Sequence, residues 1–189
     1  MKIYTRTGDS GETGLLGGVL IPKSNLVICA CGELDETNCQ IGLARSYGVS
    51  KAVDDVLGAI QKDLFVLGSQ VADCLSEKAS RAASLQENRI AQLEQHIDEF
   101  ESELEPMDAF ILPGGCTAGA QLHVARTVCR RAERTMVKML RKTNANATRA
   151  NAEIPNCVIF LNRLSDLLFV MARHVNHAND SQETKWLPG

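Results

Sequence analysis

The stretch VDDVLGAIQKDLFVLGSQVADC, residues 53–74, decides the fold class. Its apolar residues recur at alternating steps of four and three, as Val53, Leu57, Ile60, Leu64, Leu67, Val71 and Cys74. This spacing places them in one stripe along an α-helix, and such a stripe is buried by packing against other helices. The stretch therefore predicts an amphipathic helix of a helical bundle.

Three other stretches carry the same pattern, namely residues 90–104, 122–139 and 158–175. A less apolar helix, about 31 to 47, precedes them, and its acidic beginning at 32–36 suits a helix N-terminus. Loops near 76–87 and 143–154 and a Pro-Gly-Gly break at 113–115 separate these segments, and no alternating strand pattern is longer than 26–31. We expect an all-α, five-helix bundle whose helices cross at about 20°.

The first two dozen residues differ from the rest, since Thr7 to Gly14 and then Gly17-Gly18 are rich in glycine and hydroxyl groups without a helical period. Glycine lets a backbone approach a ligand closely, and backbone N–H groups, hydroxyls and a carboxylate hold phosphate oxygens and Mg²⁺. The segment is not a Walker A loop, because no Gly-Lys-Ser/Thr follows it. For the segment, a plain turn is an equal alternative to a phosphate-binding loop. Lys23, which could add a cation for phosphate, has a merely solvated lysine as its alternative. We expect one domain over 1–189, with a nucleotide-binding loop at 1–25, the bundle at 26–180 and a tail at 181–189.

The composition excludes several classes of protein. With 44% hydrophobic residues, 23% charged residues and a net charge of -3, the chain has no general attraction for nucleic acid or an anionic membrane. No apolar run approaches the roughly 18 residues that span a bilayer, and no export signal begins the chain. Seven cysteines without a Cys-x-x-Cys pair predict reduced thiols and a cytoplasmic protein. His174 and His177 lack a carboxylate at matching spacing, so no protein-bound metal centre is expected.

A row of arginines is the strongest chemical signal. Arg126, Arg130 and Arg134 are four residues apart and line one helix face, and Glu133 can orient the guanidinium of Arg130. Guanidinium forks match phosphate oxygens. The alternative is a set of ion pairs with acidic residues across a helix interface, and both can hold together. The sequence offers no Ser-His-Asp pattern and no evident pair of acids.

A polar pair on the last helix is a further candidate. Asn162 and Asp166 share a face, and an unpaired buried amide costs about 1–3 kcal/mol, so Asn162 should have a specific partner. The alternative is a residue that only sets the register of the bundle.

At these places the sequence resembles the PduO-type ATP:cob(I)alamin adenosyltransferases. The similar segments are Tyr4 to Asp9 with Gly11, Gly32 to Glu36, Phe110 to Gly115 with His123 to Arg134, and Leu161 to Phe169. They stand in the family's order and reach from residue 3 to about 175. Ser10 stands where the family often has lysine, Leu34 and Thr37 replace a more usual Val and Leu, and Cys116-Thr117-Ala118-Gly119 replaces a more alanine-rich helix start.

The resemblance implies a homotrimeric five-helix bundle with active sites between subunits. It implies transfer of the 5′-deoxyadenosyl group from ATP, held with Mg²⁺, to Co(I) of a reduced corrinoid such as cobalamin, with release of triphosphate. The residues expected to hold ATP are Thr5, Arg6, Thr7, Gly8, Asp9, Thr13, Gly14, Lys23, Arg126, Arg130, Arg131, Ala132, Glu133, Arg134 and Asn162.

The resemblance also implies roles in the reaction for Arg130, Asp35, Phe110 and Glu133. Asp35 is expected to bond Arg130 across the subunit boundary, and Phe110 to press on the lower face of the corrin and keep the lower ligand off cobalt. A corrinoid reductase and an adenosylcobalamin-dependent enzyme are the protein partners that fit. The competing functions are a carrier or chaperone that delivers adenosylcobalamin, and an ATP hydrolase or phosphotransferase.

Overall fold

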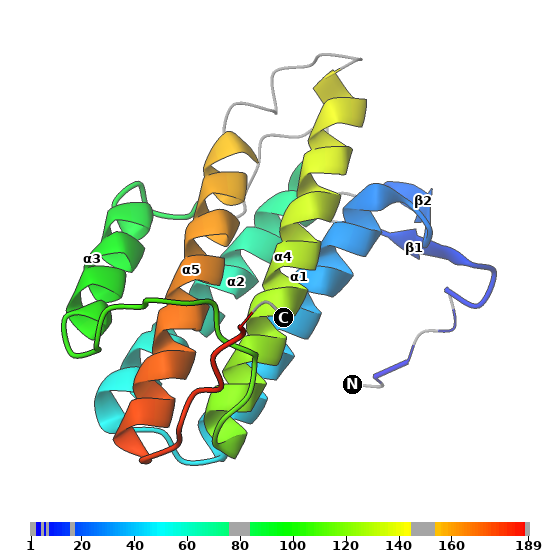
Figure 1. Cartoon of the computed structure of the whole chain (residues 1–189). Coiled ribbons are helices and arrows are strands. Elements are labelled where there is room, and N and C mark those ends of the chain that lie inside the picture. The colour runs from blue at the N-terminus through cyan, green and yellow to red at the C-terminus, as the bar shows by residue number, and fades with distance from the viewer. Residues whose placement is uncertain are drawn as a thin grey trace.

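The computed structural model describes residues 3–4, 6, 8–15, 18–75, 84–144 and 154–187. Within these ranges the helices are α1 Leu26–Ser46, α2 Lys51–Asp73, α3 Arg89–Glu101, α4 Thr117–Asn144 and α5 Ile154–Ala178. The four long helices lie side by side, with α4 between α1 and α5, and α3 lies outside against α5 (Figure 1). The expected five-helix, all-α fold is confirmed.

The core forms where the sequence places the apolar stripes. All six residues from Val53 to Val71 that were assigned to the stripe of α2 are at most 2% exposed, and the stripes of α4 and α5 belong to the same buried core except for the partly buried Val158. In α3 only Leu93 and Phe100 are buried, so this helix covers the bundle from outside. The core positions of α2, α4 and α5 thus follow from the periodicity, whereas the buried residues of α1 were not predicted by a stripe.

The first helix begins earlier than expected, at Leu26 and not near residue 31. Asn25 caps it, because its side-chain oxygen accepts a hydrogen bond from the Val27 N–H at 3.0 Å. The short stretch at 26–31, whose alternation resembled a strand, is the first part of this helix. The cap at Asn25 was the sequence signal that the prediction overlooked.

The N-terminal segment contains a short hairpin that the sequence did not predict. Strand β1 Glu12–Gly14 pairs antiparallel with β2 Leu20–Pro22, and Thr13 lies opposite Ile21. Ile21 is buried and joins the hairpin to the core, and Figure 1 shows the hairpin beside the start of α1. Three-residue strands are too short for an alternating pattern to reveal them.

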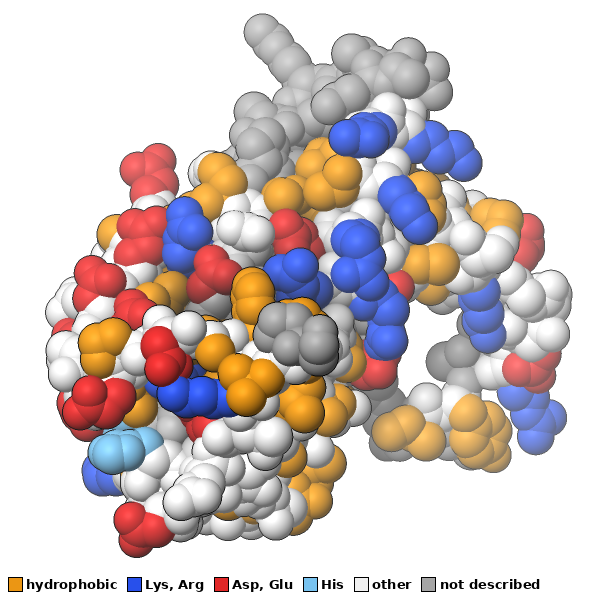
Figure 2. Space-filling model, in the orientation of Figure 1, with side chains coloured by type: hydrophobic (Ala, Val, Ile, Leu, Met, Phe, Trp, Pro, Cys, Tyr) orange, Lys and Arg blue, Asp and Glu red, His pale blue; other side chains and the backbone are white. Residues whose placement is uncertain are grey.

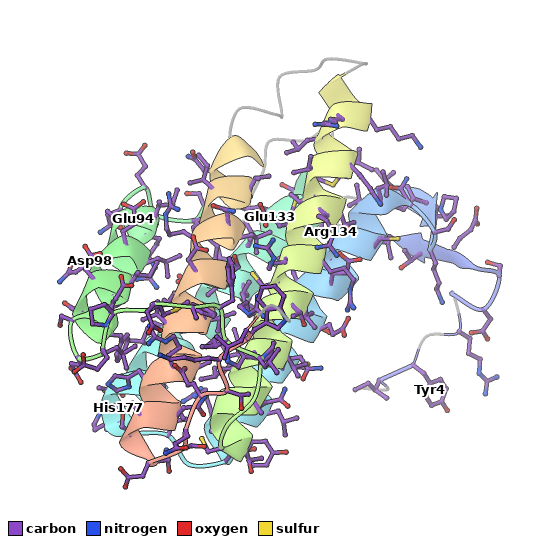
Figure 3. The ribbon with its side chains drawn as sticks, in the orientation of Figure 1. Tyr4, Glu94, Asp98, Glu133, Arg134 and His177 are labelled. Carbon is purple, nitrogen blue, oxygen red and sulfur yellow. The ribbon has the colours of Figure 1, made fainter. Side chains whose placement is uncertain are left out.

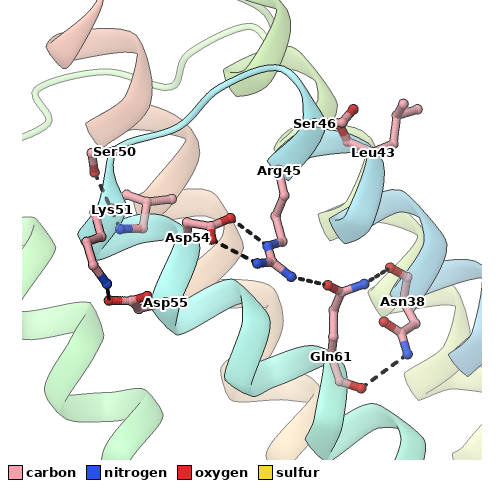
Figure 4. A network of polar contacts seen from close by, with 10 residues as sticks. Asn38, Leu43, Arg45, Ser46, Ser50, Lys51, Asp54, Asp55 and Gln61 are labelled. Atoms are coloured by element: carbon pink, nitrogen blue, oxygen red, sulfur yellow. Dashed lines mark hydrogen bonds and ion pairs between the residues drawn. The ribbon is translucent and has the colours of Figure 1, made fainter.

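A polar network joins α1 to α2 (Figure 4). Arg45 donates to both carboxylate oxygens of Asp54, at 2.7 and 2.8 Å, and to the Gln61 side-chain oxygen at 2.7 Å. Gln61 and Asn38 also bond each other's backbone carbonyl groups. A side chain at Gly58 would meet the Arg45 guanidinium at 3.3 Å, so glycine there makes room for the arginine. The network fixes the register of the α1–α2 pair.

Two segments outside the helices lie side by side over α4 and α5 (Figure 1). They are residues 105–116, which connect α3 to α4, and the tail 181–187. The Leu112 N–H donates to the Thr184 carbonyl at 2.8 Å, the Trp186 N–H donates to the Phe110 carbonyl at 2.7 Å, and Ile111 lies opposite Lys185. The tail thus holds the segment that presents Phe110.

No helix in the described part of the chain combines the length and apolar character needed to cross a bilayer.

Candidate functional site: a cationic cavity on α4 and α5

A cavity of about 390 Å³ opens between α4 and α5. Its lining residues are Arg130, Glu133, Arg134, Val137, Lys138 and Asn162. Lys and Arg side chains gather along α4 on this face of the molecule (Figure 2). With three cationic side chains and one carboxylate, the cavity suits an anion.

Hydrogen bonds arrange the polar groups of this cavity. The Asn162 side chain donates from Nδ2 to Glu133 Oε1 at 3.3 Å, so it has a partner on α4, but it is exposed and not the buried amide that the sequence argument assumed. Arg134 donates from Nη1 to the Arg130 carbonyl at 3.0 Å. For the Arg130 guanidinium we find no hydrogen bond or ion pair among the described residues, and the side chain is exposed. Arg130 is therefore available to a ligand, and Figure 3 shows where Glu133 and Arg134 project from α4.

Arg131 lies in a different environment from its neighbour Arg130. Its Nη2 is bonded to the Glu36 carboxylate, and its Nε lies 3.9 Å from Glu33 Oε1. The Glu36 hydrogen bond raises the pKa of Arg131. Arg131 thus joins α4 to α1, and Ala132 is fully buried against the core, so the side chains of both lie off the cavity.

Arg126 extends the cationic row one turn toward the start of α4. It is half-buried, its Cζ lies 5.8 Å from the centre of the Phe169 ring, and its Nε has no hydrogen-bond partner in the described part of the chain. Burial, and then the charge of Arg130, lower the pKa of Arg126. A bound anion would relieve both the repulsion between the two arginines and the missing hydrogen bond.

His123 precedes Arg126 on α4 and faces the inside of the bundle. It is 3% exposed, its ring lies 5.9 Å from that of Phe169, and neither ring nitrogen has a hydrogen-bond partner among the residues that the structure describes. Burial, and then the charge of Arg126, lower the pKa of His123 to about 4. A neutral His123 at pH 7 follows.

The N-terminal segment brings some of the predicted phosphate-binding residues together. A side chain at Gly8 would come within 3.1 Å of Lys23 Nζ, so glycine leaves space for the lysine, and the Lys23 N–H donates to the Gly11 carbonyl at 2.9 Å. Arg6 has a positive φ of 62°, and its guanidinium lies 5.5 Å from the Tyr4 ring centre. The remaining expected residues divide into those that the structure describes, Asp9, Thr13 and Gly14, and those outside the described residues, Thr5 and Thr7.

The N-terminal residues and the cavity do not join within one chain. No hydrogen bond or ion pair links 8–15 or 18–25 to the cavity residues, as far as the described residues extend, and Figure 3 shows Tyr4 apart from Glu133 and Arg134. Asp35 and Phe110 are exposed, Phe110 at 72%. Both can therefore contact a ligand or a second subunit.

The sequence reasoning missed Val137 and Lys138 in the cavity lining. Each lies four residues after a predicted site residue, Glu133 and Arg134, so extending the row by one helical turn would have found them. Among the described residues, no group of three or more His, Cys, Asp or Glu side chains is placed to hold a metal ion.

The family model described as cobalamin adenosyltransferase matches residues 3–175. The chain belongs to the cobalamin adenosyltransferase family. A cobalamin adenosyltransferase of Cupriavidus metallidurans is 40% identical over 186 residues, which cover 98% of this chain and 94% of that protein. A corrinoid adenosyltransferase of Mycobacterium leprae is 37% identical over 193 residues, with coverage of 100% and 96%.

Solved structures of the family have the same fold. A phenylalanine-to-alanine variant of the PduO-type ATP:corrinoid adenosyltransferase from Lactobacillus reuteri, complexed with cobalamin and ATP, superimposes with a TM-score of 0.88 at 33% identity. That match covers 99% of this chain and 100% of the other. An arginine-to-lysine variant of the same protein, complexed with ATP, gives a TM-score of 0.85 at 33% identity, with coverage of 98% and 100%. The family resemblance drawn from the sequence segments is confirmed.

Proposed function

We propose that the chain transfers the 5′-deoxyadenosyl group of ATP to Co(I) of a reduced corrinoid, forming adenosylcobalamin and releasing inorganic triphosphate. The observation that carries this function is the cationic cavity of Arg130, Arg134 and Lys138, with Asn162 and Glu133, on the bundle of a cobalamin adenosyltransferase. The related structure from Lactobacillus reuteri is complexed with both cobalamin and ATP.

The triphosphate of ATP is the proposed occupant of the cavity. The charges of Arg126 and Arg130 repel each other, and Arg126 Nε lacks a hydrogen-bond acceptor among the described residues. A polyanion would supply both the opposite charge and the acceptor oxygens. Arginine binds phosphate oxygens with two parallel bonds, whereas the cation of Lys138 acts as a point charge. Since Arg131 is bonded to Glu36, we assign it the placement of α4 on α1 rather than contact with phosphate.

The glycine-rich segment would close the ATP site from a neighbouring subunit of a homotrimer. Within one chain it lies apart from the cavity, while Asp35 is exposed on α1 and available to the Arg130 of another chain. In this arrangement Lys23 and the backbone N–H groups near Gly8 would bind phosphate oxygens. Each active site would then lie between two copies of the chain.

The reaction is a nucleophilic displacement. The cobalt lone pair of Co(I) forms a bond to C5′ of ATP, the C5′–O bond breaks, and its electron pair leaves with triphosphate. Because Co(I) is already a strong nucleophile, the protein needs no general base. Holding cobalt and carbon in line can supply about 7–11 kcal/mol of the barrier, and the arginines stabilise the charge that grows on the leaving oxygens.

The donors present fit a Mg²⁺ ion that arrives with ATP. Asp9 and the Thr13 hydroxyl are oxygen donors of the kind Mg²⁺ prefers, and phosphate oxygens and water would complete its coordination. When bound, the ion would neutralise part of the triphosphate charge.

The corrinoid would lie against Phe110. This side chain is 72% exposed although it is large and apolar, and the tail holds its backbone in place. An apolar group below the corrin excludes the lower ligand, and cobalt without that ligand is easier to reduce from Co(II) to Co(I). We place this function in the cytoplasm, with a corrinoid reductase as electron source and an adenosylcobalamin-dependent enzyme as recipient.

The function is tested by mixing the purified protein anaerobically with chemically reduced cob(I)alamin, ATP and Mg²⁺. We expect the absorption spectrum of adenosylcobalamin together with triphosphate in the same amount. Release of phosphate or ADP without a change in the corrinoid would indicate a hydrolase or phosphotransferase. Tight binding of adenosylcobalamin without turnover would indicate a carrier.

A further inference from the structure

Asn176, near the end of α5, is 1% exposed and contacts the Pro113-Gly114-Gly115 turn that follows Phe110. We propose that Asn176 is a positioning residue for the corrinoid, because it joins this turn to the C-terminal tail and so sets the place of Phe110. The inference rests on the proposed role of Phe110 below the corrin.

The side chain of Asn176 uses both ends of its amide on the turn. Its Oδ1 accepts from the Cys116 N–H at 3.1 Å, and its Nδ2 donates to the Gly114 carbonyl at 3.0 Å. Because the oxygen and the nitrogen of this buried amide are both bonded to the turn, the position of the turn is fixed. Any shift of the turn would leave a buried polar group unpaired. Cys116 directly precedes α4, so the same bonds fix where that helix begins.

The backbone of Asn176 holds the start of the tail. Its carbonyl accepts from the Ser181 N–H at 2.9 Å and from the Asn179 N–H at 3.1 Å, which ends the helix and turns the chain back. The tail then pairs with the Phe110 segment through the bonds of Trp186 and Leu112 described above. Asn176 therefore contacts both the 105–116 segment, which carries Phe110, and the start of the tail that pairs with it.

Two glycines are required by the position of this amide. A side chain at Gly115, whose φ is +106°, would lie 2.2 Å from Asn176 Oδ1, and one at Gly119 would lie 2.0 Å from the same atom. Neither approach is possible for a real side chain. The Asn176 amide therefore leaves room for glycine, and for no larger residue, at positions 115 and 119 of this chain.

The decisive experiment compares two starting states of cobalt. Co(I) carries no lower ligand, so adenosylation of chemically reduced cob(I)alamin does not need Phe110 in place, whereas adenosylation that starts from cob(II)alamin with a reductant does. Asn176→Asp keeps the acceptor for the Cys116 N–H but loses the donor and sets a carboxylate against the Gly114 carbonyl. We expect the rate from Co(II) to fall by about 10- to 100-fold, with the rate from Co(I) and the KM for ATP unchanged.

The matched control is Asn179→Asp. Asn179 directly follows α5 and is exposed, and its side chain donates from Nδ2 to the Val175 carbonyl at 2.8 Å, the one side-chain hydrogen bond found for it among the described residues. Both rates should stay at their wild-type values. Equal losses from Co(I) and Co(II) in Asn176→Asp, or no loss at all, would overturn the positioning role.

A second variant keeps the inference testable if Asn176→Asp does not fold. Gly119→Ala displaces the same amide from the other side, so it should lower the Co(II) rate selectively. Added to Asn176→Ala, it should cost less than it costs alone, because the Asn176 atoms at 2.0 and 2.8 Å are gone and only the Ala172 carbonyl, at 3.2 Å, still crowds the new side chain. Full additivity of the two changes would contradict a common action through the amide.

Phe110→Ala separates this inference from the function it rests on. If Phe110→Ala keeps the Co(II) rate, the role of Phe110 is wrong and the positioning role falls with it. If Phe110→Ala loses that rate while Asn176→Asp and Gly119→Ala keep it, only the role of Asn176 is wrong.

Discussion

Arg130 and Arg131 are adjacent in sequence, yet their side chains lie in different surroundings, from which we proposed different roles. Arg130 lines the cavity and its guanidinium has no partner among the described residues, whereas Arg131 is bonded to Glu36 of α1. Replacing each by methionine, which keeps the unbranched stem and the helix propensity but removes the guanidinium group, should separate ATP binding from stability. We expect Arg130→Met to lower activity and Arg131→Met to lower the melting temperature.

The size of each effect follows from the surroundings. Arg131 and Glu36 are each 44% exposed, and an ion pair of that kind contributes about 0.2–1 kcal/mol. Glu33 is only 21% exposed, and its Oε1 lies 3.9 Å from Arg131 Nε, so this second carboxylate adds a small amount to the stabilisation. A total near 1 kcal/mol corresponds to about 2–4 °C in melting temperature for a chain of this size. A charged hydrogen bond from Arg130 to phosphate contributes about 1.5–3 kcal/mol, hence about 10- to 150-fold in kcat/KM.

The assays are kcat/KM for ATP with saturating cob(I)alamin, and thermal unfolding followed by circular dichroism at one protein concentration. Arg130→Met should lower kcat/KM and leave the melting temperature of the single chain almost unchanged. If Asp35 of a neighbouring subunit bonds Arg130, the variant should also assemble more weakly. Arg131→Met should show the thermal loss with less than a tenth of that kinetic effect. A larger loss of activity in Arg131→Met than in Arg130→Met would refute the division of tasks.

Three other predictions concern stability and reactivity. His123 has a pKa of about 4 in the folded chain against an ordinary 6.5, so between these pH values the unfolded chain binds one more proton than the folded chain. The free energy of unfolding therefore falls as the pH drops through this window, by up to about 3 kcal/mol. In urea titrations, the change in unfolding free energy between pH 7.5 and pH 5 should be smaller for His123→Leu than for the wild type, and an identical change would contradict the assignment. Arg45→Lys loses the two-pronged bond to Asp54 and should lower the unfolding free energy by about 1 kcal/mol in urea titrations, since the pair is partly exposed. Cys39 is exposed while Cys129 is buried with a raised pKa, so iodoacetamide at pH 7.5 should label Cys39 first by peptide mass mapping, and early labelling of Cys129 would contradict the packing.

The helices could be predicted because their apolar residues repeat over many turns. The stripe from Val53 to Val71 is buried as its spacing requires, whereas the start of α1 depends on one capping residue, Asn25, and the hairpin at 12–22 on strands of three residues. Periodicity averages over a long stretch, so it cannot detect features that one or two residues determine.

The grouping of Arg130 and Arg134 at one cavity was predictable, because four-residue spacing on one helix sufficed. The separation of Arg131 from them could not be predicted, because it depends on which face of α4 meets Glu36 of α1. The role of Asn176 was hidden for a similar reason. Its partners at 114 and 116 are about sixty residues away, and a lone asparagine late in a helix has no pattern that points to them.

The most direct test of the account is transfer of label from ATP under anaerobic conditions with cob(I)alamin. ATP would carry tritium on C5′ and ³²P in its γ-phosphate, and the products would be separated by chromatography. Tritium should appear in the corrinoid and ³²P in intact triphosphate, in a one-to-one ratio, since cobalt attacks C5′ and triphosphate leaves whole. Tritium that stays in ADP or adenosine, with ³²P in free phosphate, would contradict the account.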